Sequence, residues 1–108
     1  LSNEKQKRTI VFYSKKLIEG KDNISLYIPF KGRIKRIYAK LSNESTEDLN
    51  ISIKKETGEV ITSLLIEKGN DFRSTLLNYE MDYEMLTASL EGEAGLENIT
   101  VCLDVILE

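Results

Sequence analysis

The chain offers few side chains that could catalyse a reaction, because histidine is absent and cysteine occurs once, as Cys102. A Ser-His-Asp triad and a histidine-ligated metal site are therefore excluded within this chain. The missing histidine also removes the base that usually activates a cysteine nucleophile. Cys102 lies within an apolar alternation, so we interpret it as a small packing residue. Phosphate-binding loops of the G-x-G-x-x-G and Walker types are absent as well. We expect a protein that is not an enzyme and uses no cofactor.

Three carboxylates, Glu80, Asp82 and Glu84, are spaced two residues apart. On a β-strand this spacing would put all three on one side, because successive side chains point to opposite faces. Such oxygen-rich clusters can bind Ca²⁺. However, no D-x-[DN]-x-[DN]-G loop accompanies them, and a solvated strand face is the simpler interpretation. We therefore predict no metal site.

Basic side chains form two clusters, one at Lys5, Lys7 and Arg8 and one at Arg33, Lys35 and Arg36. Nucleic-acid-binding proteins combine basic patches with stacking aromatic rings, and Tyr38 lies near the second cluster. A sequence pI near 5.1 argues against a chain that holds a polyanion, so nucleic acid is an unlikely partner. We predict instead an interaction surface formed by both basic clusters, Tyr38 and the three carboxylates.

Alternating apolar residues indicate the elements that must position these groups. At the C-terminus, Ile99, Val101, Leu103, Val105 and Leu107 fall on one face of a strand. Similar alternation predicts strands over residues 9–13, 24–30, 33–41, 49–55, 60–66, 86–90 and 96–107. Residues 75–85 fit either a strand or a short helix. About eight short strands predict an all-β protein, an antiparallel β-sandwich with jelly-roll-like connections.

Length and charge define the domain organisation. A chain of 108 residues forms one domain, which we place at 9–108, after a flexible, charged N-terminal arm at 1–8. Residues 1–55 carry 13 basic and 6 acidic side chains, whereas residues 56–108 carry 2 and 12. Such asymmetry suggests partner binding, but it would vanish if strands of the two halves interleave. No apolar run approaches the roughly 18 residues of a membrane span, so no membrane partner is expected.

Three segments carry a family resemblance. They are I-P-F-K-G-R-I at 28–34 leading into I-Y-A-K-L at 37–41, L-x-I-x-I at 49–53 followed by T-G-E-V-I at 57–61, and L-T-A-S-L at 86–90 turning into 96–107. They resemble the small jelly-roll-like β-sandwich modules of tailed-phage virion proteins, found in tail, fibre and head-decoration components. The Lys/Glu-rich composition and the short 91–95 turn depart from that pattern. The resemblance implies a non-enzymatic, oligomeric virion part and carries over no site residue.

Three functions remain open at this point. The first is a structural and assembly module of a bacteriophage particle, located in the virion, that forms a homo-oligomer and contacts other virion proteins. The second is a module that binds carbohydrate or a host surface, with Tyr13, Tyr27, Tyr38, Tyr79 and Tyr83 lining a surface for a glycan. The third is a nucleic-acid-binding β-barrel that uses the basic cluster at 33–36.

Overall fold

The computed structural model describes residues 6–108, which form six β-strands and no helix that could span a membrane. The strands are β1 (Lys7–Lys16), β2 (Lys21–Leu41), β3 (Leu49–Lys55), β4 (Val60–Ile66), β5 (Phe72–Glu91) and β6 (Glu97–Leu107). All pairs are antiparallel, in the order β1-β6-β2-β5-β3-β4. The prediction of an all-β, antiparallel fold is confirmed.

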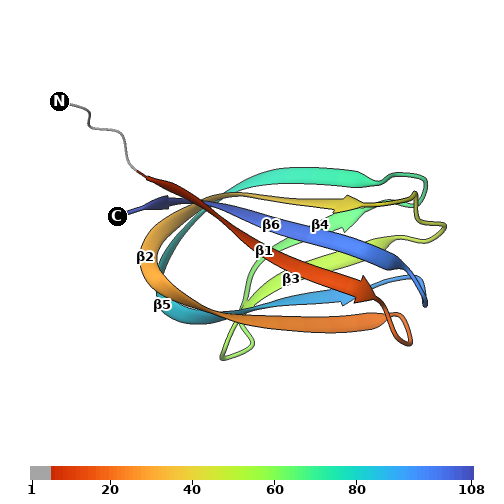
Figure 1. Cartoon of the computed structure of the whole chain (residues 1–108), viewed down its shortest axis with the longest axis horizontal. Helices are drawn as coiled ribbons and strands as arrows, with labels where there is room; N and C mark the ends of the chain where they lie inside the picture. Colours follow the sequence, from red (N-terminus) through yellow and green to blue (C-terminus); the bar gives the residue numbers. More distant parts are fainter. Residues whose placement is uncertain (1–5) are drawn as a thin grey trace.

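The two longest strands, β2 and β5, run along each other and bend together near their middles (Figure 1). The bend divides the strands into two layers. The β6 layer contains β1, β6, residues 31–41 of β2 and residues 72–82 of β5. The β3 layer contains residues 21–28 of β2, residues 84–91 of β5, β3 and β4. The two layers enclose one core, so the fold is a jelly-roll-like β-sandwich.

A β-bulge produces the bend. Between two ladder pairs, Pro29 and Phe30 of β2 lie opposite Tyr83 alone. Tyr83 has φ 44°, in the left-handed region that aromatic residues rarely adopt. An unpaired extra residue bends its strand and increases the local twist. Pro29 has no N–H to donate, so a bulge is one of the few places where a strand interior accepts it.

This bend explains why the structure has six strands where the sequence predicts about eight short ones. The predicted strands 24–30 and 33–41 are two parts of β2, and Lys31 and Gly32, which separate them in the prediction, lie within that strand. Residues 75–85, left open between strand and helix, belong to β5. Gly32 allows β6 to approach, because a Cβ there would lie 2.6 Å from Val105 Cγ1 and 2.9 Å from the Ile106 carbonyl oxygen.

The core follows the predicted alternation. Ile99, Val101, Leu103 and Val105 of β6 are all buried, and Leu107 is partly buried at the end of the strand. They pack with the inward side chains of both layers, which are mainly Ile and Leu. The described structure therefore uses the apolar positions for packing, as the period of two predicts.

The N-terminal boundary differs from the sequence prediction. β1 begins at Lys7, and Lys7 and Arg8 pair with Ile106 and Val105 of β6, so these two residues belong to the sheet and not to an arm. Lys5 lies outside the described residues.

The strands of the two halves interleave, because β6 lies between β1 and β2. The ion pairs Lys31–Asp82, Arg33–Glu80 and Lys40–Asp71 all join the basic half to the acidic half. Much of the charge asymmetry along the chain is thus balanced within the folded domain.

Candidate functional site

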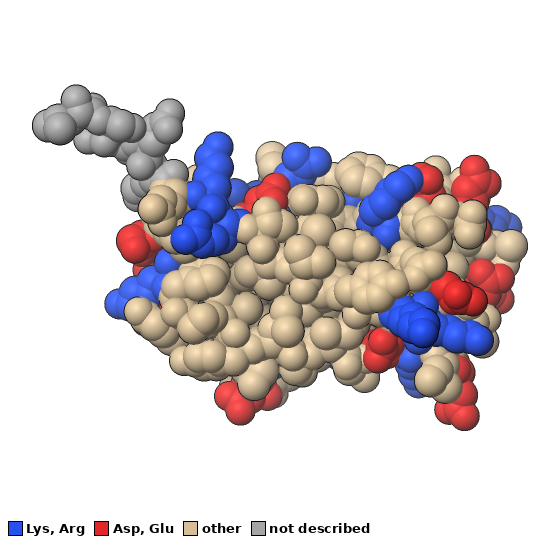
Figure 2. Space-filling view, viewed as in Figure 1, with Lys and Arg blue, Asp and Glu red and all other residues tan. Residues whose placement is uncertain are grey.

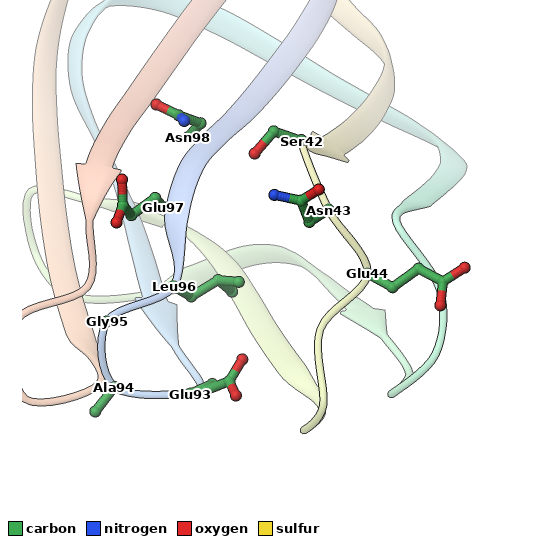
Figure 3. Close-up of a pocket in the computed structure, with 9 residues that line it drawn as sticks. All are labelled: Ser42, Asn43, Glu44, Glu93, Ala94, Gly95, Leu96, Glu97 and Asn98. Carbon is green, nitrogen blue, oxygen red and sulfur yellow. The ribbon is translucent and has the colours of Figure 1, made fainter.

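Two hollows lie at opposite ends of the β6 layer. The first, which we call the end hollow, has a volume of about 390 Å³ and lies between the β2–β3 and β5–β6 connections (Figure 3). Its lining is Ser42, Asn43, Glu44, Glu93, Ala94, Gly95, Leu96, Glu97 and Asn98. Ligand pockets of small molecules typically start at roughly 300 Å³, so the end hollow lies at the small end of that range.

Side chains that form hydrogen bonds surround the end hollow. In Figure 3, Ser42 and Asn43 reach from the end of β2 toward the start of β6, and Glu93 points up between the two connections. Glu44 points away from this space. Leu96, which is almost fully buried, contributes an apolar surface. The hollow therefore combines several polar groups with a small apolar area, so its lining is more polar than that of a typical small-molecule pocket.

Two of these polar groups are held by neighbouring side chains. The Tyr13 hydroxyl donates to Asn98 Oδ1 at 2.5 Å, which leaves the Asn98 amide NH₂ as a donor. The Thr46 hydroxyl donates to Glu93 Oε1, which leaves the second carboxylate oxygen as an acceptor. Asn98 has φ 54°, a left-handed conformation that asparagine tolerates better than most residues. The hollow thus presents a positioned acceptor at Glu93, whereas the Asn98 side chain turns toward β1 and Tyr13 (Figure 3).

Backbone hydrogen bonds fix the connections that carry these groups. The Gly95 amide donates to the Leu17 carbonyl at 2.8 Å, and the Leu17 amide donates to the Leu96 carbonyl at 2.8 Å. Gly20 (φ 77°) packs so closely that a Cβ would lie 2.6 Å from the Gly92 carbonyl oxygen. The β1–β2 connection therefore holds the β5–β6 connection in place.

The second hollow, the basic groove, lies on the outer side of the β6 layer toward the bend and also measures about 390 Å³. It is lined by Lys7, Arg8, Thr9, Lys35, Arg36, Leu76, Asp104, Val105 and Ile106. Figure 2 shows basic side chains gathered near the start of β1, with a broad uncharged area beside them. Four of the predicted interaction residues, Lys7, Arg8, Lys35 and Arg36, thus lie around one hollow.

A second bulge turns two consecutive basic residues to the same side. Ile34 pairs with Val105 and Arg36 with Asp104, so Lys35 has no partner on β6. The extra residue shifts the alternation by one, and both Lys35 and Arg36 line the groove. The predicted basic cluster of β2 therefore gains a common orientation that regular alternation would not give.

Arg33 and the three carboxylates are engaged elsewhere. Arg33 pairs with Glu80 at 3.5 Å and with Glu108 at 3.8 Å, and Asp82 lies 4.0 Å from Lys31. Glu84 accepts a hydrogen bond from the Tyr79 hydroxyl at 2.7 Å.

The expectation of one acidic face was wrong. The bulge at Tyr83 shifts the alternation, so Glu84 pairs with the buried Ile28, whereas Asp82 pairs with the exposed Lys31. Within residues 6–108 no three His, Cys, Asp or Glu side chains are placed to hold a metal ion.

The five tyrosines do not form one surface. Tyr13 is exposed on β1, Tyr27 on the part of β2 in the β3 layer, and Tyr83 at the bend. Tyr79 packs against the core, and desolvation with the nearby Glu84 raises its pKa above the usual tyrosine range. Tyr38 pairs with Cys102 in the β6 layer. Only Tyr13 adjoins the end hollow.

Cys102 lies on the outer side of β6, yet only 7% of it is exposed. Its partners across the strands are Val11 and Tyr38, so neighbouring side chains on the same face cover it. Burial raises the pKa of the Cys102 thiol. The environment fits a packing residue, as the sequence suggested, although the face on which it packs is the outer one.

Sequence reasoning missed the residues of the end hollow. The segments 42–48 and 91–95 lie between predicted strands, and nothing in the sequence indicates that these two connections meet. Asn98 was equally hidden, because a polar residue before Ile99 is ordinary strand alternation. A left-handed Asn98 is visible only in the backbone.

No family model and no curated protein matches the chain. Solved structures do share its fold. The CBM36-1 domain of a multidomain xylanase from the hindgut metagenome of Trinervitermes trinervoides has a TM-score of 0.56 at 11% identity, over 89% of this chain and 96% of that one. A structure of Bacillus endospore appendages, described as disulfide-linked pili, has a TM-score of 0.56 at 12% identity, over 97% and 90%.

A Streptococcus pneumoniae fucose binding module, SpX-3, has a TM-score of 0.50 at 11% identity, over 91% of this chain and 72% of that one. None of these three is described as a virion protein. Identities this low establish the jelly-roll-like sandwich fold and nothing about the ligand.

Proposed function

We propose that this domain is a non-catalytic carbohydrate-binding module whose end hollow holds a neutral sugar residue. One observation carries the proposal: a single hollow presents the carboxylate acceptor of Glu93 among polar side chains, with Asn98 in its lining. Each sugar hydroxyl both donates and accepts, so it matches a carboxylate acceptor and neighbouring amide or hydroxyl groups. The apolar C–H face of the sugar ring would pack on the exposed Tyr13 ring, since Leu96 is almost fully buried.

Tyr13 supplies an aromatic surface at the edge of the hollow. Its side chain is 52% exposed although its hydroxyl is bonded to Asn98, so the ring is held in place while one face stays accessible. An amphipathic ring of this kind gives contact area at little entropic cost. Three glutamates line the hollow, which disfavours an acidic sugar there and favours a neutral one.

The shared fold of the structural neighbours supports the proposal, but it is weaker evidence than the residues of the end hollow. A fucose binding module and the CBM36-1 domain of a xylanase share this sandwich. The same fold hosts unrelated functions, so the argument for sugar binding depends on the residues of the end hollow.

A screen of neutral oligosaccharides followed by calorimetric titration tests this function. We use Asn98→Gly, because glycine keeps the left-handed backbone and removes only the amide, and Tyr13→Ala. Each should weaken binding by at least about tenfold, since a lost hydrogen bond or ring contact is worth roughly 1.4 kcal/mol. The control is Tyr27→Ala, an equally exposed tyrosine (57%) in the other layer. Absence of any binder, or equal weakening by the control, would overturn the proposal.

A second candidate is the oligomeric structural module, whether of a virus particle or of another assembly. It is supported by the outer side of the β6 layer, where Val11, Phe72 and Leu76 are 46–80% exposed. A structural neighbour that forms pili is compatible with this function. Light scattering coupled to size-exclusion chromatography tests it: stable oligomers are expected, and a monomer at high concentration would count against it.

A further inference from the structure

The Arg36 guanidinium in the basic groove is held in position by two contacts before any ligand arrives. Its Nε donates to Ser74 Oγ at 2.7 Å, and its central carbon lies 5.2 Å from the centre of the Tyr38 ring. These contacts fix the plane of the guanidinium and leave its two terminal NH₂ groups for a ligand. Such a fork matches the two oxygens of a carboxylate or of a sulfate or phosphate ester.

The four cations of the groove form no ion pair, which is also true of most basic side chains in the described residues. Among the described residues, Lys31, Arg33 and Lys40 form ion pairs within 4.0 Å. Within the same part of the chain, none of Lys7, Arg8, Lys35 or Arg36 forms one. Four basic residues, two on β1 and two on β2, therefore line one hollow on either side of β6, with Asp104 as the one carboxylate in the lining. A bound anion would relieve their mutual repulsion.

The remaining groups of the groove restrict which anion fits. Leu76 is 80% exposed and Ile106 is partly exposed, so an apolar surface adjoins the cations. Asp104 accepts a long hydrogen bond (3.4 Å) from the Thr9 hydroxyl and keeps capacity for another donor. A ligand that fits carries an anionic group, a hydroxyl donor and an apolar ring face within the size of one hollow.

We propose that the basic groove binds an acidic sugar residue, a ring whose carboxylate engages Arg36 and whose hydroxyl donates to Asp104. This second site rests on the proposed function of the module but uses residues that the end hollow does not share. The neutral and the acidic subsite lie at opposite ends of the β6 layer, so one chain of mixed sugars could contact both. A DNA strand has no free hydroxyl on its internal sugar rings, and a polyglutamate has no hydroxyl-bearing ring, so neither offers this combination.

Matched ligands separate charge from shape. The probes are short oligosaccharides of galacturonate, glucuronate or mannuronate, each compared with its methyl ester, which keeps the ring and its hydroxyls and removes the charge. At low ionic strength we expect one uronate to bind with a stoichiometry of one, and its ester to bind at least about tenfold more weakly. A single-stranded oligonucleotide of equal charge should bind more weakly than the uronate.

Matched variants locate the site. Arg36→Gln should weaken uronate binding by at least about tenfold, whereas Arg33→Gln, which removes a paired arginine outside the groove, should change it by less than about twofold. Asn98→Gly should leave uronate binding unchanged even where it abolishes neutral sugar binding, so failure of one site is distinguishable from failure of the other. The proposal is wrong if no uronate binds, if the ester binds equally, if both arginine variants weaken binding alike, or if the oligonucleotide binds as well.

Discussion

The replacement Gly32→Ala tests the geometry that brings β6 onto β2. An added Cβ would lie 2.6 Å from Val105 Cγ1 and 2.9 Å from the Ile106 carbonyl oxygen, closer than real Cβ contacts. Val105 is 1% exposed and lies between core neighbours, and the carbonyl belongs to the sheet backbone, so neither yields easily. Overpacking of this kind costs about 1–3 kcal/mol. Because two contacts are violated together, we expect a loss of about 2–3 kcal/mol.

Urea denaturation followed by circular dichroism measures this loss in the free energy of unfolding. In thermal denaturation, a loss of this size in a domain of about 100 residues lowers the melting temperature by roughly 10 °C or more. Val105→Ala serves as the second mutation of a double-mutant cycle, because it removes the Cγ1 atom that the new methyl would meet. Gly32→Ala should cost at least about 1 kcal/mol less in the Val105→Ala background. A cost below about 0.5 kcal/mol, or equal costs in both backgrounds, would refute the close approach.

Three further predictions concern titratable groups. Burial raises the pKa of Cys102, so the native thiol should react slowly with a disulfide reagent near pH 8 and rapidly in urea; equal rates would contradict the burial. Desolvation and Glu84 raise the pKa of Tyr79 above its unfolded value, so the stability that it contributes is present at neutral pH and lost as the pH rises past about 10. Tyr79→Phe should reduce this alkaline loss, which pH-dependent denaturation measures. The hydrogen bond from Lys40 lowers the pKa of Asp71, so Lys40→Ala should raise that pKa toward its ordinary value in an NMR titration, and an unchanged pKa would exclude the contact.

The fold could be predicted because its core obeys the simplest rule of β-structure. The alternation of Ile99 to Val105 identifies a strand with one buried face, and the structure buries those residues. The number of strands could not be predicted in the same way. Pro29 and Gly32 indicate a turn in most sequences, whereas here the bulge opposite Tyr83 carries the chain through as one bent strand. A bulge is decided by long-range pairing, which local sequence does not contain.

The same distinction applies to the candidate sites. The two basic clusters were visible in the sequence as charges, but their convergence depends on β6 entering between β1 and β2. The carboxylates of residues 80–84 were equally visible, and the prediction of one acidic face was wrong because the left-handed Tyr83 shifts the alternation. The end hollow gave no sequence signal, since it is formed by two connections that lie far apart in the chain. The charged residues can thus be identified from the sequence, whereas their positions relative to one another become known only with the fold.

One strand accounts for the position of both candidate subsites. The start of β6 places Asn98 at the end hollow, and the final residues of the same strand place Asp104 at the basic groove. Because Ile99, Val101 and Leu103 fill the core between these points, β6 cannot shift along its neighbours without moving its apolar side chains out of register. Packing of the core therefore fixes the distance between the two subsites along the β6 layer. A ligand that contacts both must match this spacing, so selectivity for chain length would depend on the register of β6 with β1 and β2.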